Sequence, residues 1–200
     1  MVPRHENGVT LVELLVTIAA LVILASLAVP SFNAVLQNNG LTASVNSLIT
    51  DFTLARAEAL KRNSPVTICR SNNANADAPS CGTGDRWDEG WVVFIDENGD
   101  GAIDGGEEVL AREGSLPARG VQVTVLASDA PLDDALTYLP SGFPDFDAAV
   151  DGGRDMLFCD QRASDAFARV INVSQTGRTQ VRARTDLGED ALTCEPPEEE

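Results

Sequence analysis

An acidic segment in the middle of the chain has the oxygen ligands and the spacing of a calcium loop. The candidate ligands are Asp96, Asn98, Asp100, Ala102 through its backbone carbonyl, Asp104 and Glu107. Calcium suits this set because a hard cation takes about six to eight oxygen ligands from a flexible loop. A calcium loop of this kind lies between helices, whereas the residues before Asp96 read as a strand. A hairpin turn with solvated acids is therefore the alternative interpretation. The sequence indicates no required cofactor, and calcium is its one candidate ligand.

Four cysteines could form two disulfides or one metal site. They are Cys69, Cys81, Cys159 and Cys194. An even number of cysteines favours disulfides in a domain exported to an oxidising compartment, and the absence of a C-x-x-C pair argues against a metal. Three pairings are open from sequence alone. Closure between sequence neighbours favours Cys69–Cys81 and Cys159–Cys194, which would tie the C-terminal segment to a core strand.

The rest of the composition excludes most catalytic classes. The 200 residues suit one domain of ordinary size, and the single histidine, His5, excludes a His-based triad or a multi-His zinc site. No nucleophile–base pair is evident, and Gly99 and Gly101 lie in an acidic turn that would repel phosphate. The net charge of −17 should make most of the surface repel nucleic acid and anionic lipid headgroups. We therefore predict that the protein is not an enzyme.

A long apolar segment near the N-terminus is suited to anchor the rest of the chain. Residues 9–29 contain four polar residues, Thr10, Glu13, Thr17 and Ser26. A run of this length can cross a bilayer as a helix, which takes about 20 residues. Inserting Glu13 into the membrane would cost about 2.5–3.5 kcal/mol at the bilayer centre. Its presence therefore indicates a functional carboxylate with a partner. The alternative is an ordinary signal peptide with Ser26-Leu27-Ala28 as its cleavage site, which would release a secreted calcium-binding domain beginning near Val29.

A second helical segment is predicted over residues 30–63. Pro30 should bend the helix if it does not end it, because proline removes one helical hydrogen bond. Beyond it, apolar residues recur at i, i+3, i+4 and i+7, which indicates an amphipathic helix packed on a head domain. They include Phe32, Val35, Leu36, Val45, Leu48, Ile49, Phe52 and Ala59. The helix should end near Arg62-Asn63, because Pro65 follows and Asn63 tolerates a left-handed cap.

The remaining chain should form a β-rich head over residues 64–194, followed by a solvated acidic tail over 195–200. Short β-branched runs between turn residues predict its strands. They are Val66–Arg70, Trp91–Ile95, Glu108–Glu113, Val121–Leu126, Thr137–Leu139, Met156–Cys159, Arg169–Val173 and Thr179–Arg184. A long N-terminal helix before a mainly antiparallel sheet is an α+β architecture.

The N-terminal residues Gly8-Val9-Thr10-Leu11-Val12-Glu13, the apolar run and Pro30 resemble the start of type IV pilins and type II secretion pseudopilins. The resemblance implies that residues 1–8 are a leader, that a prepilin peptidase cleaves after Gly8, and that it methylates Val9, where the family usually has Phe. Glu13 would then be the fifth mature residue and would pair with the positive N-terminus of a neighbouring subunit. Such a pair is far less costly to bury than either charge alone.

Two segments of the head are similar to the GspH/FimT subfamily of minor pilins and pseudopilins. They are Trp91–Gly101, a strand that runs into an acidic turn, and Ser174-Gln175-Thr176-Gly177-Arg178. Residues 127–155 match no motif. The resemblance implies a type IV pilin-like fold, a single-pass inner-membrane helix and a periplasmic head. Its implied partners are other pilins, the prepilin peptidase and the inner-membrane assembly platform. A type II secretion pseudopilin is the first functional interpretation, and a type IV pilus subunit for priming or DNA uptake is the second.

Arg178, Arg182 and Arg184 form the densest basic cluster. In some FimT-like members a Gly-Arg-x-Arg element is associated with DNA uptake, and Gly177-Arg178 begins such an element here. The next arginine is Arg182, displaced from the family spacing, so only Arg178 carries over. Strand alternation would place Arg182 and Arg184 on one face. The alternative is a solvated face that offsets nearby acids, and no aromatic residue lies between the arginines to stack on bases.

Overall fold

The computed structural model of the chain describes residues 10–82, 86–116, 123–127, 134–145, 154–186 and 193–194, without the side chains of residues 27–31, 123, 126, 127 and 186. The chain divides into two compact units, residues 1–36 and residues 37–200. The predicted processing residues Gly8 and Val9, the leader and the acidic tail lie outside the described residues. The side chain of Pro30 lies outside them too.

One helix, α1 (Leu11–Arg62), accounts for both helical predictions. It passes through Pro30 and Gly40 without ending. It stops at Arg62, as predicted, because Asn63 takes a left-handed φ of 53° and Pro65 follows. In the N-terminal unit, every leucine, isoleucine and valine from Leu11 to Leu24 is more than half exposed. Among the described residues, no helix is long and apolar enough to cross a membrane.

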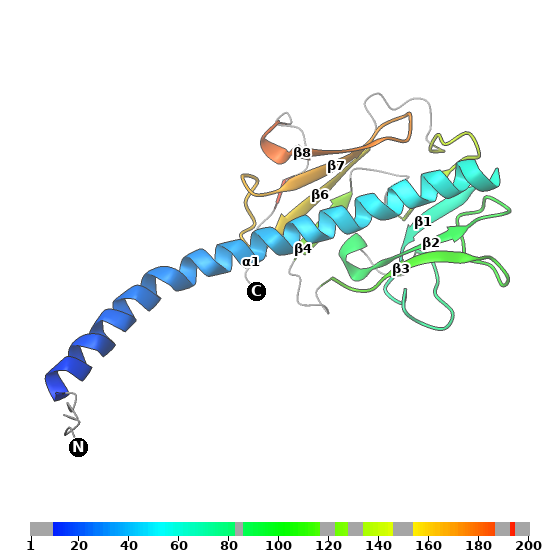
Figure 1. Ribbon diagram of the computed structural model, residues 1–200. Helices are drawn as coiled ribbons and strands as arrows, with labels where there is room; N and C mark the ends of the chain where they lie inside the picture. The colour runs from blue at the N-terminus through cyan, green and yellow to red at the C-terminus, as the bar shows by residue number, and fades with distance from the viewer. Residues whose placement is uncertain are drawn as a thin grey trace, which may run out of the picture. The chain divides into compact units, whose positions relative to one another are not determined.

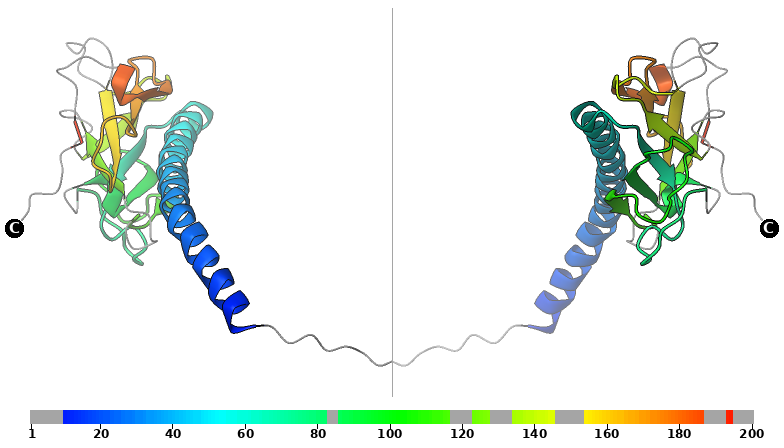
Figure 2. Two further views of the ribbon diagram at one scale, coloured as in Figure 1. Left: turned by 90° about the vertical axis from the view of Figure 1, so that its left-hand side faces the viewer. Right: turned by 90° about the vertical axis from the view of Figure 1, so that its right-hand side faces the viewer.

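The second half of α1 presents one apolar stripe to the head. Its buried residues alternate steps of four and three, which keeps them on one side of a 3.6-residue helix. They are Leu41, Val45, Leu48, Phe52, Ala55 and Ala59, each at most 3% exposed. This stripe belongs to the same core cluster as residues from both sheets of the head. As Figure 2 shows, this part of the helix lies along one side of those sheets.

In the described part of the head, the strands form two antiparallel four-stranded sheets, where the sequence predicted a single sheet (Figure 1). Sheet A has the order β3-β2-β1-β5, from β1 (Val66–Arg70), β2 (Trp91–Ile95), β3 (Val109–Glu113) and β5 (Ala135–Tyr138). Sheet B has the order β4-β6-β7-β8, from β4 (Val123–Ala127), β6 (Arg154–Asp160), β7 (Arg169–Val173) and β8 (Thr179–Ala183). The difference arises because β4 pairs with β6, whereas β5 returns to pair with β1.

The predicted strand positions are confirmed, with shifts of one or two residues at several ends. β1, β2 and β7 have the predicted bounds. β8 is one residue shorter than predicted because Arg184 already belongs to a short 3-10 helix, η3 (Arg184–Asp186). The α+β prediction is also confirmed, since one long helix packs on antiparallel sheets.

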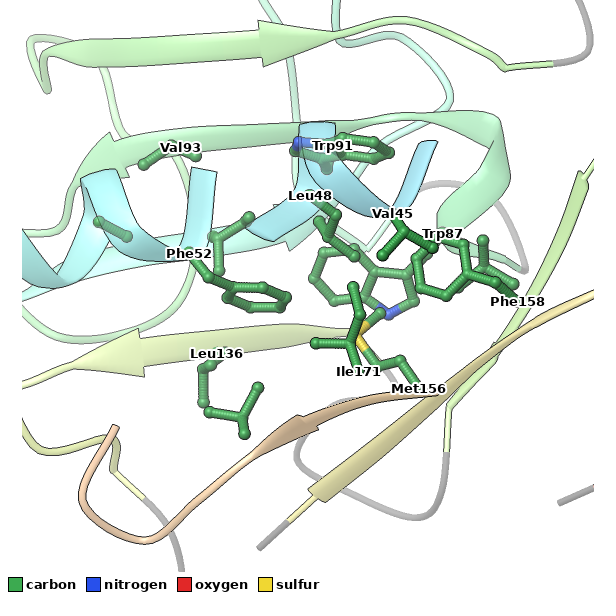
Figure 3. Packing of buried hydrophobic residues seen from close by; sticks show 14 of the residues in the cluster. Val45, Leu48, Phe52, Trp87, Trp91, Val93, Leu136, Met156, Phe158 and Ile171 are labelled. Carbon is green, nitrogen blue, oxygen red and sulfur yellow. The ribbon is translucent and has the colours of Figure 1, made fainter. Parts of the chain in front are cut away.

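The core lies between α1 and the two sheets (Figure 3). Phe52 of α1 faces Trp87 of a second 3-10 helix, η1 (Trp87–Glu89), with ring centroids 6.3 Å apart. Around this pair lie side chains from α1 and from strands of both sheets. These are Val45, Leu48, Trp91, Val93, Leu136, Met156, Phe158 and Ile171. One continuous apolar core therefore joins the helix to both sheets.

Replacing Phe52 by alanine should destabilise the head strongly, because the side chain is fully buried and its removal leaves a cavity beside Trp87. We expect Phe52→Ala to lower the free energy of unfolding by about 3–5 kcal/mol in urea titrations of the oxidised protein. Thr53→Ala, at the exposed neighbouring position, is the control and should change it by less than about 0.5 kcal/mol. Equal effects of the two substitutions would contradict this packing.

Candidate functional sites

The acidic turn between β2 and β3 is organised around Asp96, which is fully buried. Its Oδ1 accepts hydrogen bonds from the backbone N–H groups of Gly99, at 2.7 Å, and Asp100, at 3.1 Å. Its Oδ2 accepts from the N–H of Gly101, at 3.0 Å, and from the hydroxyl of Thr67, at 2.7 Å. Both carboxylate oxygens are thus already engaged in holding the turn.

The side chains of the candidate ligands Asn98, Asp100, Asp104 and Glu107 also form hydrogen bonds within the turn. The side-chain amide of Asn98 donates to Asp100 Oδ2 at 2.8 Å and to Asp104 Oδ2 at 3.1 Å. The backbone N–H of Ala102 donates to Asp100 Oδ1 at 2.9 Å. Glu107 accepts from the N–H of Asp104 through Oε2, at 2.9 Å.

Nowhere in the described ranges do three or more Asp, Glu, His or Cys side chains form a group that could hold a metal. The calcium interpretation is therefore unsupported. The hydrogen bonds of Asp96, Asn98 and Asp100 are those of the alternative, an Asx-rich hairpin turn.

The cysteines form two disulfides, and each joins a cysteine to its neighbour in sequence, as predicted. Cys69 of β1 is bonded to Cys81, with Cα atoms 5.4 Å apart, and Cys159 of β6 is bonded to Cys194, with Cα atoms 5.7 Å apart. The N–H of Cys194 also donates to Asp165 Oδ1 at 2.9 Å. The second disulfide therefore fastens the C-terminal segment to the outer face of sheet B, where Cys159 and Cys194 pack with Leu157 and Val170.

The three C-terminal arginines do not form one surface. Arg178 and Arg182 are exposed, whereas Arg184 is 7% exposed and its Nε lies 3.8 Å from Asp165 Oδ2. The prediction that Arg182 and Arg184 share a strand face is wrong, because β8 ends at Ala183 and Arg184 begins η3. A basic face made of all three arginines is thereby excluded, and the buried one serves the packing of the head.

The Ser174–Arg178 segment is a tight hairpin turn between β7 and β8. The N–H of Gly177 donates to the carbonyl of Ser174 at 2.8 Å, and Gly177 has a φ of 75°. A Cβ atom added to Gly177 would lie 2.6 Å from the carbonyl oxygen of Gly142 and 3.0 Å from the ring of Tyr138. Arg56 of α1 donates through Nε to that same Gly142 carbonyl at 2.9 Å. Gly177 therefore allows parts of α1, sheet A and sheet B to meet.

A buried carboxylate joins η1 to sheet B. Asp88 accepts a hydrogen bond at Oδ1 from the backbone N–H of Val125, at 3.1 Å, and one at Oδ2 from Arg86, at 3.2 Å. Burial raises the pKa of Asp88, and the hydrogen bond from Val125 opposes this shift. Among the described strands β4 is at an edge of sheet B, so the carboxylate of Asp88 satisfies the backbone N–H of Val125, which no described strand reaches. Asp88 is structural in this position.

Sequence reasoning missed a groove of about 320 Å³ between α1 and β3. Its lining residues are Ala43, Asn46, Ser47, Thr50 and Asp51 of α1 and Ala111, Arg112 and Glu113 of β3. Asp51 Oδ2 accepts a 2.6 Å hydrogen bond from the indole N–H of Trp91, and Ser47 donates to Glu113 Oε2 at 3.0 Å. Burial raises the pKa of Asp51, and the bond from Trp91 opposes this shift. The one sign of this groove in the sequence is the carboxylate of Asp51, which lies beside the apolar stripe of the predicted helix.

Gly177→Ala should cost more stability than the same change at a glycine of equal φ in open space. Gly99 provides that control, since its φ is 74° and an added Cβ would meet nothing within 4 Å. We expect Gly99→Ala to cost about 1–2 kcal/mol from the left-handed conformation alone. Gly177→Ala should cost more, because the Gly142 carbonyl must move. Urea titrations of both variants test this, and equal losses would contradict the close approach.

Asp51→Asn should become more stable relative to the unsubstituted protein as the pH rises. Because burial raises the folded-state pKa of Asp51, its contribution to stability is present in full below its unfolded-state pKa, near 3.8, and is lost as the pH rises through the folded pKa. An asparagine keeps an acceptor for Trp91 without the buried charge. The difference in unfolding free energy between the two proteins, measured at pH 3.5 and pH 7, should shift towards the variant. A constant difference would show that the carboxylate is not perturbed.

Comparison with known proteins places these features in a family. The sequence profile of the family described as type II transport protein GspH matches residues 44–177, and the prokaryotic N-terminal methylation motif matches residues 3–29. No curated protein matches the chain. The chain is similar to two crystal structures of the type IV minor pilin FimU from Pseudomonas aeruginosa strain PAO1, in space groups P21 and P65.

The structural likeness extends over most of both proteins. The P21 structure has a TM-score of 0.56 and is 18% identical, over 78% of this chain and 96% of FimU. The P65 structure has a TM-score of 0.53 and is 17% identical, over 77% of this chain and 99% of FimU. At these identities the likeness shows a shared fold, the type IV pilin fold. The family profile runs from the buried stripe of α1 to Gly177 of the β7–β8 turn and so covers most of the head. The chain therefore belongs to the GspH family of type II transport proteins.

Proposed function

We propose that the protein is a minor pseudopilin that is assembled into the pseudopilus of a type II protein secretion system. The observation that carries this proposal is the methylation motif at residues 3–29, joined through a single helix to a head that matches the GspH profile. Its activity is assembly rather than catalysis, and it needs no cofactor.

Processing begins the proposed pathway. A prepilin peptidase cleaves after Gly8 and methylates Val9, which makes Glu13 the fifth residue of the mature chain. The backbone N–H of Glu13 donates to the hydroxyl of Thr10 at 3.2 Å, so Glu13 lies in the first turn of α1, where a carboxylate is favoured by the helix dipole. Its exposed side chain is then available to the positive N-terminus of a neighbouring subunit, and Pro30 follows as part of the assembly helix.

The exposed apolar side chains of Leu11 to Leu24 support a helix that is covered by lipid before assembly and by other helices afterwards. We propose that residues 9–29 cross the inner membrane once and that the head lies in the periplasm. The two disulfides agree with such an oxidising compartment. The inner-membrane assembly platform and other pseudopilins are the proposed partners.

A type IV pilus minor subunit is the second candidate, and the likeness to FimU favours it. A role in DNA uptake would rest on Arg178 and Arg182 alone, because Arg184 is buried, with its Nε 3.8 Å from Asp165 Oδ2. A deletion strain separates the two filaments, since it should lose protein secretion in the first case and pilus formation in the second. A secreted calcium-binding domain, the candidate from another class, would instead begin near Val29.

The mature protein, isolated from membranes of its own host, should begin at N-methylated Val9. Intact mass and N-terminal sequencing measure this directly. The variant Gly8→Val should keep its leader and stay in the membrane unprocessed, because the residue before the cut is changed. A soluble mature chain that begins near Val29 would overturn the proposal, since it would lack Glu13 altogether.

A further inference from the structure

β3 forms an open edge of sheet A. It pairs with β2 along one side, and no other strand of the described residues pairs with its second side. An edge strand presents a row of backbone donors and acceptors, to which an extended segment of another chain can add. The backbone of β3 is therefore a template for one further strand.

The groove between α1 and β3 has this edge strand as one of its walls. Ala43, Asn46, Ser47 and Thr50 follow one another at i, i+3, i+4 and i+7 and so share one face of α1. All four side chains are small or short, and three of them, Ala43, Asn46 and Thr50, are exposed. Alternate side chains of a strand added to β3 would point towards this face. Because these four residues are small, the groove, with a volume of about 320 Å³, has room for the side chains of the added strand.

The side-chain charge of the groove is negative. Asp51 lies at its α1 wall and Glu113 at its β3 wall. Arg112 also lines the groove, but its guanidinium donates to the carbonyl of Ala76 at 2.8 Å, in the loop after β1. The carboxylate of Asp51 is partly desolvated, and burial raises its pKa, so a cation at this place would relieve an existing cost.

We propose that an extended segment of a neighbouring filament subunit adds to β3 as a fifth strand of sheet A and places a Lys or Arg side chain in the groove, against Asp51 and Glu113. The proposal rests on the proposed function for the identity of its partner. A different subunit fits better than a second copy, because two heads of this chain carry the same strongly negative charge and repel each other.

The test uses the full chain in detergent micelles and two synthetic nine-residue peptides with high strand propensity. One carries Arg at every second position and the other carries Glu there. Backbone amide resonances of Ala111, Arg112 and Glu113 and the indole N–H of Trp91, which donates to Asp51, report binding by NMR. We expect saturable shifts of these signals with the Arg peptide, and at least tenfold weaker binding of the Glu peptide.

A charge-matched pair of variants separates the groove from the general negative charge. Asp51→Asn with Glu113→Gln should weaken binding of the Arg peptide at least fivefold. Glu97→Gln with Asp145→Asn, at exposed positions that do not line the groove, should leave it within twofold. Equal loss in both double variants, or peptide shifts confined to residues 96–107, would overturn the proposal.

Failure of this proposal is distinguishable from failure of the proposed function. The peptide titration uses purified protein and does not depend on cleavage after Gly8 or on filament assembly. If the chain binds the Arg peptide but is not methylated at Val9, the groove proposal is supported and the pseudopilin proposal is contradicted. If the chain is methylated at Val9 but gives no saturable shifts with the Arg peptide, the pseudopilin proposal is supported and the groove proposal is contradicted.

Discussion

The rest of the head depends on one apolar stripe of α1. Leu41, Val45, Leu48, Phe52, Ala55 and Ala59 are all buried, and they contribute to the same core as strands of sheet A and sheet B. The sheets have no strand in common, so without the helix each would expose the face that it now packs into this core. The two small sheets therefore form one unit because both pack against this stripe.

Buried and half-buried polar groups then fix how the parts meet. Asp88 of η1 reaches the backbone of β4, and Arg56 of α1 reaches the carbonyl of Gly142 beside the Gly177 turn. Asp96 organises its own turn through four hydrogen bonds. Asp88 and Asp96 are buried, so leaving either of them without its hydrogen-bond partners would cost about 1–3 kcal/mol. In the sequence, the acidic residues of this turn resemble a set of metal ligands. In the structure, the hydrogen bonds of Asp96 hold the turn together.

The sequence predicted features that depend on local patterns. The end of α1 at Arg62 followed from Asn63 and Pro65, and the strand positions followed from runs of β-branched residues between turns. Division into two sheets could not be predicted, because it depends on β4 pairing with β6 and on β5 returning to β1. Arg184 was misplaced because β8 ends at Ala183 and Arg184 begins η3, where its side chain is buried near Asp165. The groove of Asp51 and Glu113 joins residues 62 positions apart, which no local pattern reveals.

The charge of the chain limits how it can assemble. Chains with a net charge of −17 repel one another, so the attraction between subunits has to come from elsewhere. The exposed apolar side chains of Leu11 to Leu24 supply attraction that does not depend on charge, and Glu13 adds one attractive pair if its neighbour presents a free amine. On the head, a contact is favourable where the partner brings positive charge to a groove with carboxylates. An acidic head thus favours contacts with unlike subunits over contacts with itself.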